Sequence, residues 1–324
     1  MILTYILLPI GFYILIKGAS FLVEGASSMA KKFGISSLVI GLTIVAFGTS
    51  MPELVINIFA STSGSTDIAI GNILGSNISN ILLILGISAI IFPLAVKKGT
   101  VWREIPFSLL AMIVMILMVN DTVIDQALFA GLTRVDGFVL LSFFAIFIYY
   151  TFSSRKMKSA DKEEVPVKKI PTRRAILMII AGLIGLTLGG KWIVNGSVAI
   201  ATAIGISEAV IGLTVVAIGT SLPELATSVI AALKKDVDIA VGNIIGSNIF
   251  NIFWILGVSA SINPLPFSSD LMKDALMAVF ATILLFLFLF IGKKHMISRW
   301  QGIIFVILYF SYITFLVLQE VLLK

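Results

Sequence analysis

An internal duplication constrains this chain more than any other feature. Residues 34–93 recur without a gap as residues 205–264, and 36 of the 60 positions are identical at a constant offset of 171. The segment GTSMPEL (48–54) returns as GTSLPEL (219–225), and GNILGSNISN (71–80) returns as GNIIGSNIFN (242–251). The duplication therefore predicts two copies of one apolar unit, each carrying a conspicuous carboxylate.

Composition places both copies in a membrane. The chain is 59% hydrophobic and 12% charged, with a mean hydropathy of +1.11, which is more apolar surface than a soluble domain can bury. We predict an all-α polytopic membrane protein, with Met1 opening the first membrane helix rather than a signal peptide. The ten predicted transmembrane helices cover 2–30, 35–61, 67–92, 103–119, 132–152, 173–201, 206–233, 239–263, 272–292 and 299–320.

One polar segment divides the chain into two halves. Residues 153–172 are charged, contain two prolines and lack apolar periodicity, so we expect a solvated linker. It separates a first five-helix repeat, residues 1–152, from a second, residues 173–324. The absence of Cys excludes disulfides and thiol catalysis.

The basic residues predict an orientation. With both termini outside, 18 of the 23 Lys and Arg residues and the 153–172 linker fall on the cytoplasmic side. The net charge of +6 then reflects membrane topology rather than a nucleic-acid surface. Corresponding loops of the two copies have opposite charge character, since Lys234-Lys235 replaces Ser63-Gly64. An odd number of helices per half also predicts that the second repeat is inverted relative to the first.

Each copy carries a proline-flanked glutamate at membrane depth. Pro52 and Pro223 should break their helices and free carbonyls near residues 46–49 and 217–220. Glu53 and Glu224 follow directly, about twenty residues into a helical hairpin. An ionised, unpaired carboxylate there would cost several kcal/mol, so it must be protonated, salt-bridged or bound to a cation. No basic residue lies within these helix pairs, which favours a cation over the alternative of a protonated structural glutamate.

The second motif adds neutral oxygen donors. Ser76 and Asn80 are four residues apart on one predicted helix face, and Ser247 and Asn251 repeat the spacing. With the hydroxyls of the GTS motifs, the candidate ligands are all oxygens, without sulfur or imidazole. Hard donors of this kind favour Ca²⁺ or Na⁺. Two carboxylates match one divalent ion or a few monovalent ions, which is typical of an exchanger site.

The paired motifs resemble those of the cation/Ca²⁺ exchanger superfamily and are most similar to prokaryotic Na⁺/Ca²⁺ exchangers. The resemblance covers essentially the whole chain. It implies Ca²⁺ ligation by Glu53 and Glu224, with backbone and hydroxyl oxygens from Thr49 and Thr220. It also implies flanking Na⁺ sites lined by the carbonyls of Ala46 and Ala217 and by Ser50, Ser221, Ser76 and Ser247. Helices one and six are then expected to slide across a core of eight helices.

One residue departs from the superfamily pattern. Many members carry Asp where this chain has Asn251. If that Asp is normally protonated, Asn is a close replacement; if it is ionised, this chain has one negative charge fewer and altered coupling. We therefore expect Na⁺/Ca²⁺ antiport, with H⁺ coupling or K⁺ dependence as the alternative and a passive cation channel less favoured.

Other classes of partner and chemistry are not expected. No paired His or Cys could form a catalytic metal set, so we expect neither an enzyme nor a bound cofactor. The expected partners are Ca²⁺, Na⁺ and the lipid bilayer of the cell membrane, with no nucleic acid. We expect the chain to function as a monomer.

Overall fold

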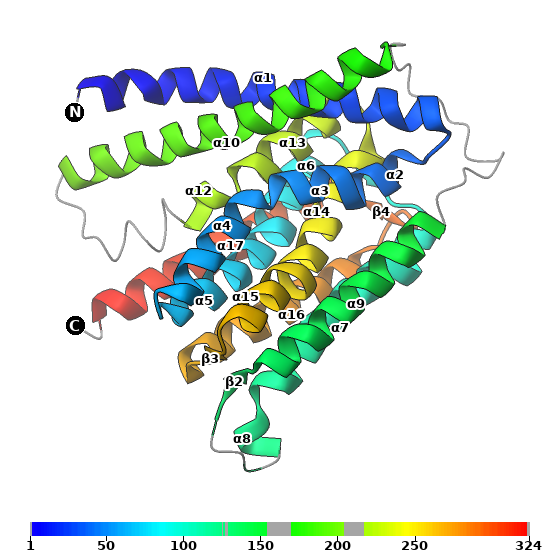
Figure 1. Ribbon diagram of the computed structural model, residues 1–324. Coiled ribbons are helices and arrows are strands. Elements are labelled where there is room, and N and C mark those ends of the chain that lie inside the picture. Colours follow the sequence, from blue (N-terminus) through cyan, green and yellow to red (C-terminus); the bar gives the residue numbers. More distant parts are fainter. Residues whose placement is uncertain (1, 125, 127–128, 154–169, 204–216, 323–324) are drawn as a thin grey trace.

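The protein is almost entirely helical (Figure 1). The computed structural model describes residues 2–124, 126, 129–153, 170–203 and 217–322. The helices of the first half are α1 (Ile2–Phe33), α2 (Ser37–Ile40), η1 (Gly41–Val45), α3 (Ala46–Thr49), α4 (Met51–Thr62), α5 (Thr66–Ile78), η2 (Ser79–Leu85), α6 (Gly86–Ile91), η3 (Thr100–Glu104), α7 (Ile105–Val119), α8 (Asp121–Ile124) and α9 (Arg134–Ser153).

The described part of the second half contains a similar series of helices, without counterparts of α2, η1 and α8. Its helices are α10 (Thr172–Ala203), α12 (Ala217–Thr220), α13 (Leu222–Leu233), α14 (Val237–Ile249), η5 (Phe250–Leu256), α15 (Gly257–Ile262), η6 (Ser269–Leu271), α16 (Met272–Phe288) and α17 (Arg299–Leu322). The elements η1, η2, η3 and η5 are short π-helices, whereas η6 is a 3₁₀ turn.

The prediction of a polytopic helical protein is confirmed. Within the described residues, eight helices are long and apolar enough to cross a membrane, and a bent pair, Ser37–Thr49 with Met51–Thr62, raises the number to nine. The predicted span 206–233 lies partly outside the described residues, which contain only its α12 and α13 portions. The predicted linker 153–172 also lies mostly outside them; α9 ends at Ser153 and α10 begins at Thr172.

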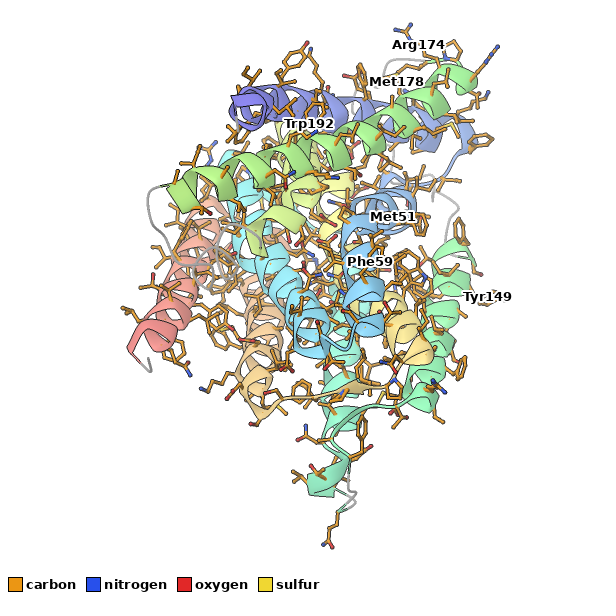
Figure 2. The ribbon with its side chains drawn as sticks, turned by 60° about the vertical axis from the view of Figure 1, so that its left-hand side comes forward. Met51, Phe59, Tyr149, Arg174, Met178 and Trp192 are labelled. Carbon is orange, nitrogen blue, oxygen red and sulfur yellow. The ribbon has the colours of Figure 1, made fainter. Side chains whose placement is uncertain are left out.

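Two long helical segments form the centre of the bundle. They are α5–η2–α6 and α14–η5–α15, whose most apolar windows are 83% and 94% buried. The other candidate spans are only 22–39% buried, so most of their surface faces outward. Figure 2 shows such outward side chains, among them Phe59 on α4 and Tyr149 on α9, which are 71% and 77% exposed. A buried centre within an apolar exterior is the arrangement expected in lipid, where no hydrophobic effect drives apolar residues inward.

Helices α1 and α10 lie side by side along one side of the bundle and run antiparallel (Figure 1). Their backbones touch at intervals of seven residues. A Cβ atom on Gly11 would lie 3.0 Å from the Gly189 carbonyl oxygen, and one on Gly18 would lie 2.9 Å from that of Gly182. One on Gly25 would lie 2.8 Å from the carbonyl oxygen of Ala175. Only glycine permits this approach, as in other small-residue interfaces of membrane helices.

Two strand pairs mark opposite ends of the bundle. Strand β1 (Leu94–Ala95), which precedes α7, pairs antiparallel with β4 (Met296–Ile297). Strand β2 (Gly131–Leu132), which follows α7, pairs antiparallel with β3 (Leu265–Pro266). At each end of the bundle, backbone hydrogen bonds therefore join two of the segments that connect the helices.

Basic residues gather at the β1–β4 end. Lys97 forms a 2.7 Å ion pair with Asp238 at the start of α14, and Lys234 forms a 2.8 Å ion pair with Glu24 of α1. Lys32 at the end of α1 donates to the Thr172 hydroxyl at the start of α10. These contacts link loops that the charge pattern assigns to one side of the membrane.

Candidate functional site

Each GTS motif sits at a break in its helix. Helix α3 ends at Thr49 and α4 begins at Met51, with a bend of 46° between the two helical segments. The intervening Ser50 has φ −84° and ψ 7°, and Ser221 between α12 and α13 has φ −86° and ψ 6°. The cause is the proline two residues later, which has no N–H to donate to the preceding turn. The predicted breaks are therefore present, with the same backbone geometry in both copies.

The first carboxylate lies at the centre of the bundle. Glu53 is 1% exposed, and its Oε1 accepts a hydrogen bond from the Ser76 hydroxyl of α5 at 3.3 Å. The Ser76 hydroxyl also lies 3.2 Å from the Ser221 hydroxyl at the other helix break. Glu53 is thereby joined through one serine to the second copy of its own motif.

The second carboxylate has matching surroundings. Glu224 is 1% exposed, and its Oε1 accepts hydrogen bonds from Ser50 at 3.1 Å and from Ser247 at 3.4 Å. The Ser50 hydroxyl also lies 3.0 Å from the Ser247 hydroxyl. Each glutamate therefore contacts the hydroxyl of a serine on its neighbouring straight helix, and the serines of the breaks join the two copies into one cluster.

The cluster has surplus negative charge and unused oxygens. Among the described residues, neither glutamate forms an ion pair, and the charge of Glu224 acts repulsively on Glu53. The Oε2 atoms of Glu53 and Glu224 and the Oδ1 atoms of Asn80 and Asn251 are buried without a hydrogen-bond partner. Buried oxygen atoms are normally satisfied, so four unsatisfied acceptors in one region indicate a place for a cation.

The threonines of the motifs contact the second motif of the other copy. The Thr49 hydroxyl lies 3.0 Å from Asn243 Oδ1, and the Thr220 hydroxyl lies 3.3 Å from Asn72 Oδ1. One expectation needs correction. The Ala46 carbonyl accepts from the backbone N–H of Ser50 at 3.0 Å and from the Thr49 hydroxyl at 3.3 Å, so the helix break does not leave it free.

The corresponding position in the second copy is described less completely. Ala217 is the first residue of α12 and directly follows residues 204–216, which lie outside the described part of the chain, so its predicted role stays a prediction. In the second copy the backbone N–H of Ser221 donates to the carbonyl of Ile218, three residues earlier in the chain. In the first copy the N–H of Ser50 donates to the carbonyl of Ala46, four residues earlier.

Four asparagines form a reciprocal network between the two central helices. Asn80 Nδ2 donates to Asn248 Oδ1 and Asn251 Nδ2 donates to Asn77 Oδ1, both at 2.9 Å. Asn77 and Asn248 in turn donate to each other's backbone carbonyls at 3.5 Å. Because the amide nitrogens are held in this way, the Oδ1 atoms of Asn80 and Asn251 are the ones left without partners.

The sequence did not identify Asn77 and Asn248 as part of the site. Their only signal is membership of the duplicated GNxxGSNxxN motif. The predicted four-residue pairing also proved incomplete, since Ser76 bonds to Glu53 whereas Asn80 bonds to Asn248.

Comparison with known proteins assigns the chain to a family. The profile of the family described as sodium/calcium exchanger protein matches residues 3–153 and 174–318. The chain is 39% identical over 321 residues to the putative antiporter CaxA of Alkalimonas amylolytica, covering 96% of this chain and 98% of that protein. It is 33% identical to the sodium/calcium exchanger MaX1 of Methanosarcina acetivorans, covering 97% of this chain and 98% of the relative.

A solved structure agrees with both sequence relatives. The sodium-calcium exchanger NCX_Mj superimposes with a TM-score of 0.82 at 36% sequence identity, covering 97% of this chain and 98% of that structure. With the family profile matched along both halves, this protein belongs to the sodium/calcium exchanger family.

Proposed function

We propose that this protein is a secondary antiporter that exchanges Na⁺ for Ca²⁺ at the cluster around Glu53 and Glu224. The observation that carries the proposal is the pair of buried carboxylates without a described ion pair, surrounded by buried oxygens without hydrogen-bond partners. Such a cluster is stable only when protons or cations neutralise it. The sodium/calcium exchangers among its relatives support cations as the cargo.

The donor set accounts for competition between the two ions. Carboxylate, hydroxyl and amide oxygens all suit hard cations, and neither a thiolate nor an imidazole contacts the described site. Two glutamates balance one Ca²⁺, and two or three Na⁺ leave only a small residual charge. Because either kind of ion can neutralise the same carboxylates, occupancy by one excludes the other.

The two halves are proposed to face each other as inverted repeats of five helices. The reciprocal bonds of Asn80 with Asn248 and of Asn251 with Asn77 support such a relation. The gathering of basic residues at the β1–β4 end supports a cytoplasmic location for that end, with the 153–172 linker beside it and both termini outside. We further propose that one chain forms a complete transport unit, since both glutamates belong to the same chain.

Transport into proteoliposomes tests the proposal. Vesicles preloaded with Na⁺, K⁺ or H⁺ separately are diluted into ⁴⁵Ca²⁺, and only the Na⁺-loaded vesicles are expected to accumulate Ca²⁺. If three Na⁺ leave per Ca²⁺, one net charge crosses per cycle, worth about 2.3 kcal/mol per 100 mV, so an imposed potential should change the rate. Ca²⁺ uptake driven by a pH gradient and not by Na⁺ would establish the proton-coupled alternative. Flux without any counter-ion would indicate a channel.

A further inference from the structure

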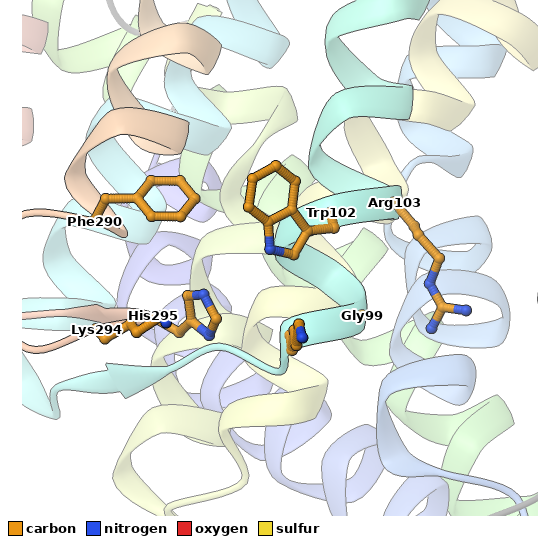
Figure 3. Close-up of a pocket in the computed structure, with 7 residues that line it drawn as sticks. Gly99, Trp102, Arg103, Phe290, Lys294 and His295 are labelled. Carbon is orange, nitrogen blue, oxygen red and sulfur yellow. The ribbon is translucent and has the colours of Figure 1, made fainter.

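A second polar region lies far from the glutamates, at the β1–β4 end of the bundle. It is a pocket of ≈ 760 Å³ lined by Lys98, Gly99, Trp102, Arg103, Phe290, Lys294 and His295. Figure 3 shows the rings of Trp102 and Phe290 facing each other above His295 and Gly99. The lining residues come from two segments almost two hundred positions apart, the start of η3 and the connection between α16 and α17.

Backbone contacts hold these two segments together. Strand β1 pairs with β4, and the N–H of Val96 donates to the His295 carbonyl at 2.7 Å. The His295 N–H donates to the Leu289 carbonyl at 2.7 Å, and His295 has a positive φ of 57°. The pocket is therefore a built feature of the fold, because its two walls are joined by hydrogen bonds rather than by loose side-chain contact.

The charge of the pocket is positive, and two of its three cations have no described carboxylate partner. Three cationic side chains line it, and none of the described lining residues is acidic. The neighbouring Lys97 is neutralised by Asp238 at 2.7 Å, whereas the described residues offer Lys98 and Lys294 no carboxylate within ion-pair distance. Arg103 is 3.9 Å from Glu104 and folds back over Gly99, where a Cβ would collide with its Nη2. Three cationic side chains thus line the pocket, and those of Lys98 and Lys294 have no described carboxylate to neutralise them, so an anion would be favoured there.

An unsatisfied ring nitrogen points to the same conclusion. His295 Nε2 is buried and has no hydrogen-bond partner among the described residues, although its ring lines the pocket. A phosphate oxygen could accept from this nitrogen when it is protonated. His295 is half-buried beside the Phe290 ring, with centroids 5.9 Å apart.

The pocket also has an aromatic part that is exposed, to which both segments contribute. Trp102 and Phe290 are 53% and 40% exposed, and their ring centroids are 5.5 Å apart. Phe286 extends this surface one helical turn further along α16, with its centroid 5.6 Å from Trp102. The candidate span Thr100–Val119 begins at this level, Ser269–Phe288 ends there, and Arg299–Gln319 begins there. A basic pocket with an exposed Trp at such a boundary faces lipid headgroups on one side and acyl chains on the other.

We propose that this pocket binds the phosphate of an anionic phospholipid, with Lys98, Arg103 and Lys294 around the headgroup and Trp102 and Phe290 against the acyl chains. The phosphate chemistry alone would also fit free phosphate. The aromatic surface continuing along the span favours the lipid, because inorganic phosphate has nothing to place there. The site does not depend on which ions the protein transports.

The test uses the full-length protein purified in detergent and titrated with dioctanoyl phosphatidylglycerol, dioctanoyl phosphatidylcholine or inorganic phosphate. Binding is followed by native mass spectrometry and by the shift in melting temperature. The variant is Lys98→Gln/Lys294→Gln, and the matched control is Arg173→Gln/Arg174→Gln, which removes two exposed cations at the same end of the bundle. At about fivefold in affinity per basic residue, the variant should bind phosphatidylglycerol roughly 25-fold more weakly than the wild type. The control should bind it normally.

Each alternative result has a definite meaning. Equal binding of phosphatidylglycerol by wild type and by Lys98→Gln/Lys294→Gln would overturn the proposal, as would an equal loss in the control pair. Saturation by inorganic phosphate at the same concentrations would assign the pocket to a soluble phosphate compound and refute the lipid. The variant's melting temperature without lipid checks its folding. If the melting temperature of the double variant is lowered, Trp102→Ala supplies a second test that keeps all three cations. Unchanged affinity of Trp102→Ala for phosphatidylglycerol would refute the apolar half of the site.

Discussion

Replacing each central glutamate by glutamine tests whether the two carboxylates hold the transported ion. Glutamine keeps an oxygen that can accept from Ser76 in Glu53→Gln, or from Ser50 and Ser247 in Glu224→Gln, so the local hydrogen bonds survive. What disappears is one of the two negative charges. Since neither glutamate has an ion-pair partner among the described residues, the ion-free protein should be as stable as the wild type or more stable.

The size of the effect follows from the burial of the site. Removing one partner of a buried charge pair costs about 3–5 kcal/mol, which corresponds to a Ca²⁺ affinity lowered by about 10² to 10⁴-fold. At a Ca²⁺ concentration 100 times the wild-type dissociation constant, bound Ca²⁺ stabilises the wild type by about 2.7 kcal/mol. With an affinity about 150-fold lower, the same Ca²⁺ stabilises the variant by only about 0.3 kcal/mol.

The assay is thermal unfolding of the purified protein with Ca²⁺ and with a chelator, combined with ⁴⁵Ca²⁺ exchange in proteoliposomes. Glu104→Gln is the matched control, because Glu104 is also a buried glutamate in a span and has an unpartnered Oε2, yet it contacts Tyr150 rather than the central cluster. The control should keep its Ca²⁺-dependent stabilisation. Undiminished Ca²⁺ stabilisation in Glu53→Gln or Glu224→Gln would refute the shared site, and a collapse of the ion-free protein would show that the glutamates are structural.

Three further outcomes are expected. Asn77→Ala should weaken Ca²⁺ binding about fivefold in calorimetry, because Asn251 loses a hydrogen bond worth about 1 kcal/mol that orients its amide; unchanged affinity would exclude this role. Asn251→Asp should transport near neutral pH and slow as pH rises, since an ionised carboxylate cannot donate to Asn77; rates that match the wild type up to pH ~9 would place residue 251 away from the ions. Burial raises the pKa of Asp236 above its ordinary value of 3.8, opposed by the Ser27 hydroxyl, so its contribution to stability is full below that value and is lost as pH rises through the raised pKa. The free energy of unfolding of Asp236→Asn should not show this decrease with rising pH. Parallel stability–pH curves for the variant and the wild type would contradict the role given to Asp236.

The parts of the site that the sequence predicted correctly depend on local rules. Proline fixes where a helix must break, so the positions of Ser50 and Ser221 followed from Pro52 and Pro223 alone. The duplication then required that whatever surrounds Glu53 should recur around Glu224. Both features are properties of short segments, and the structure reproduces them.

The parts that the sequence missed depend on contacts between distant segments. The pairing of Asn77 with Asn251 crosses from one half to the other, and no local pattern sets its partner. The basic pocket depends on the pairing of β1 with β4, which brings Lys98 and His295 into one pocket only in the folded chain.

The glycine contacts between α1 and α10 have a consequence for motion. Moving one helix along the other by a single residue, about 1.5 Å, would bring larger side chains into the three backbone contacts, so we expect the pair to travel as one body. The same α10 also packs against both helix breaks, since a Cβ on Gly48 would collide with Leu183 and one on Gly219 with Val194. A displacement of α10 that loosens its contact at one break is therefore expected to change its contact at the other, so that the two breaks are coupled mechanically through one helix.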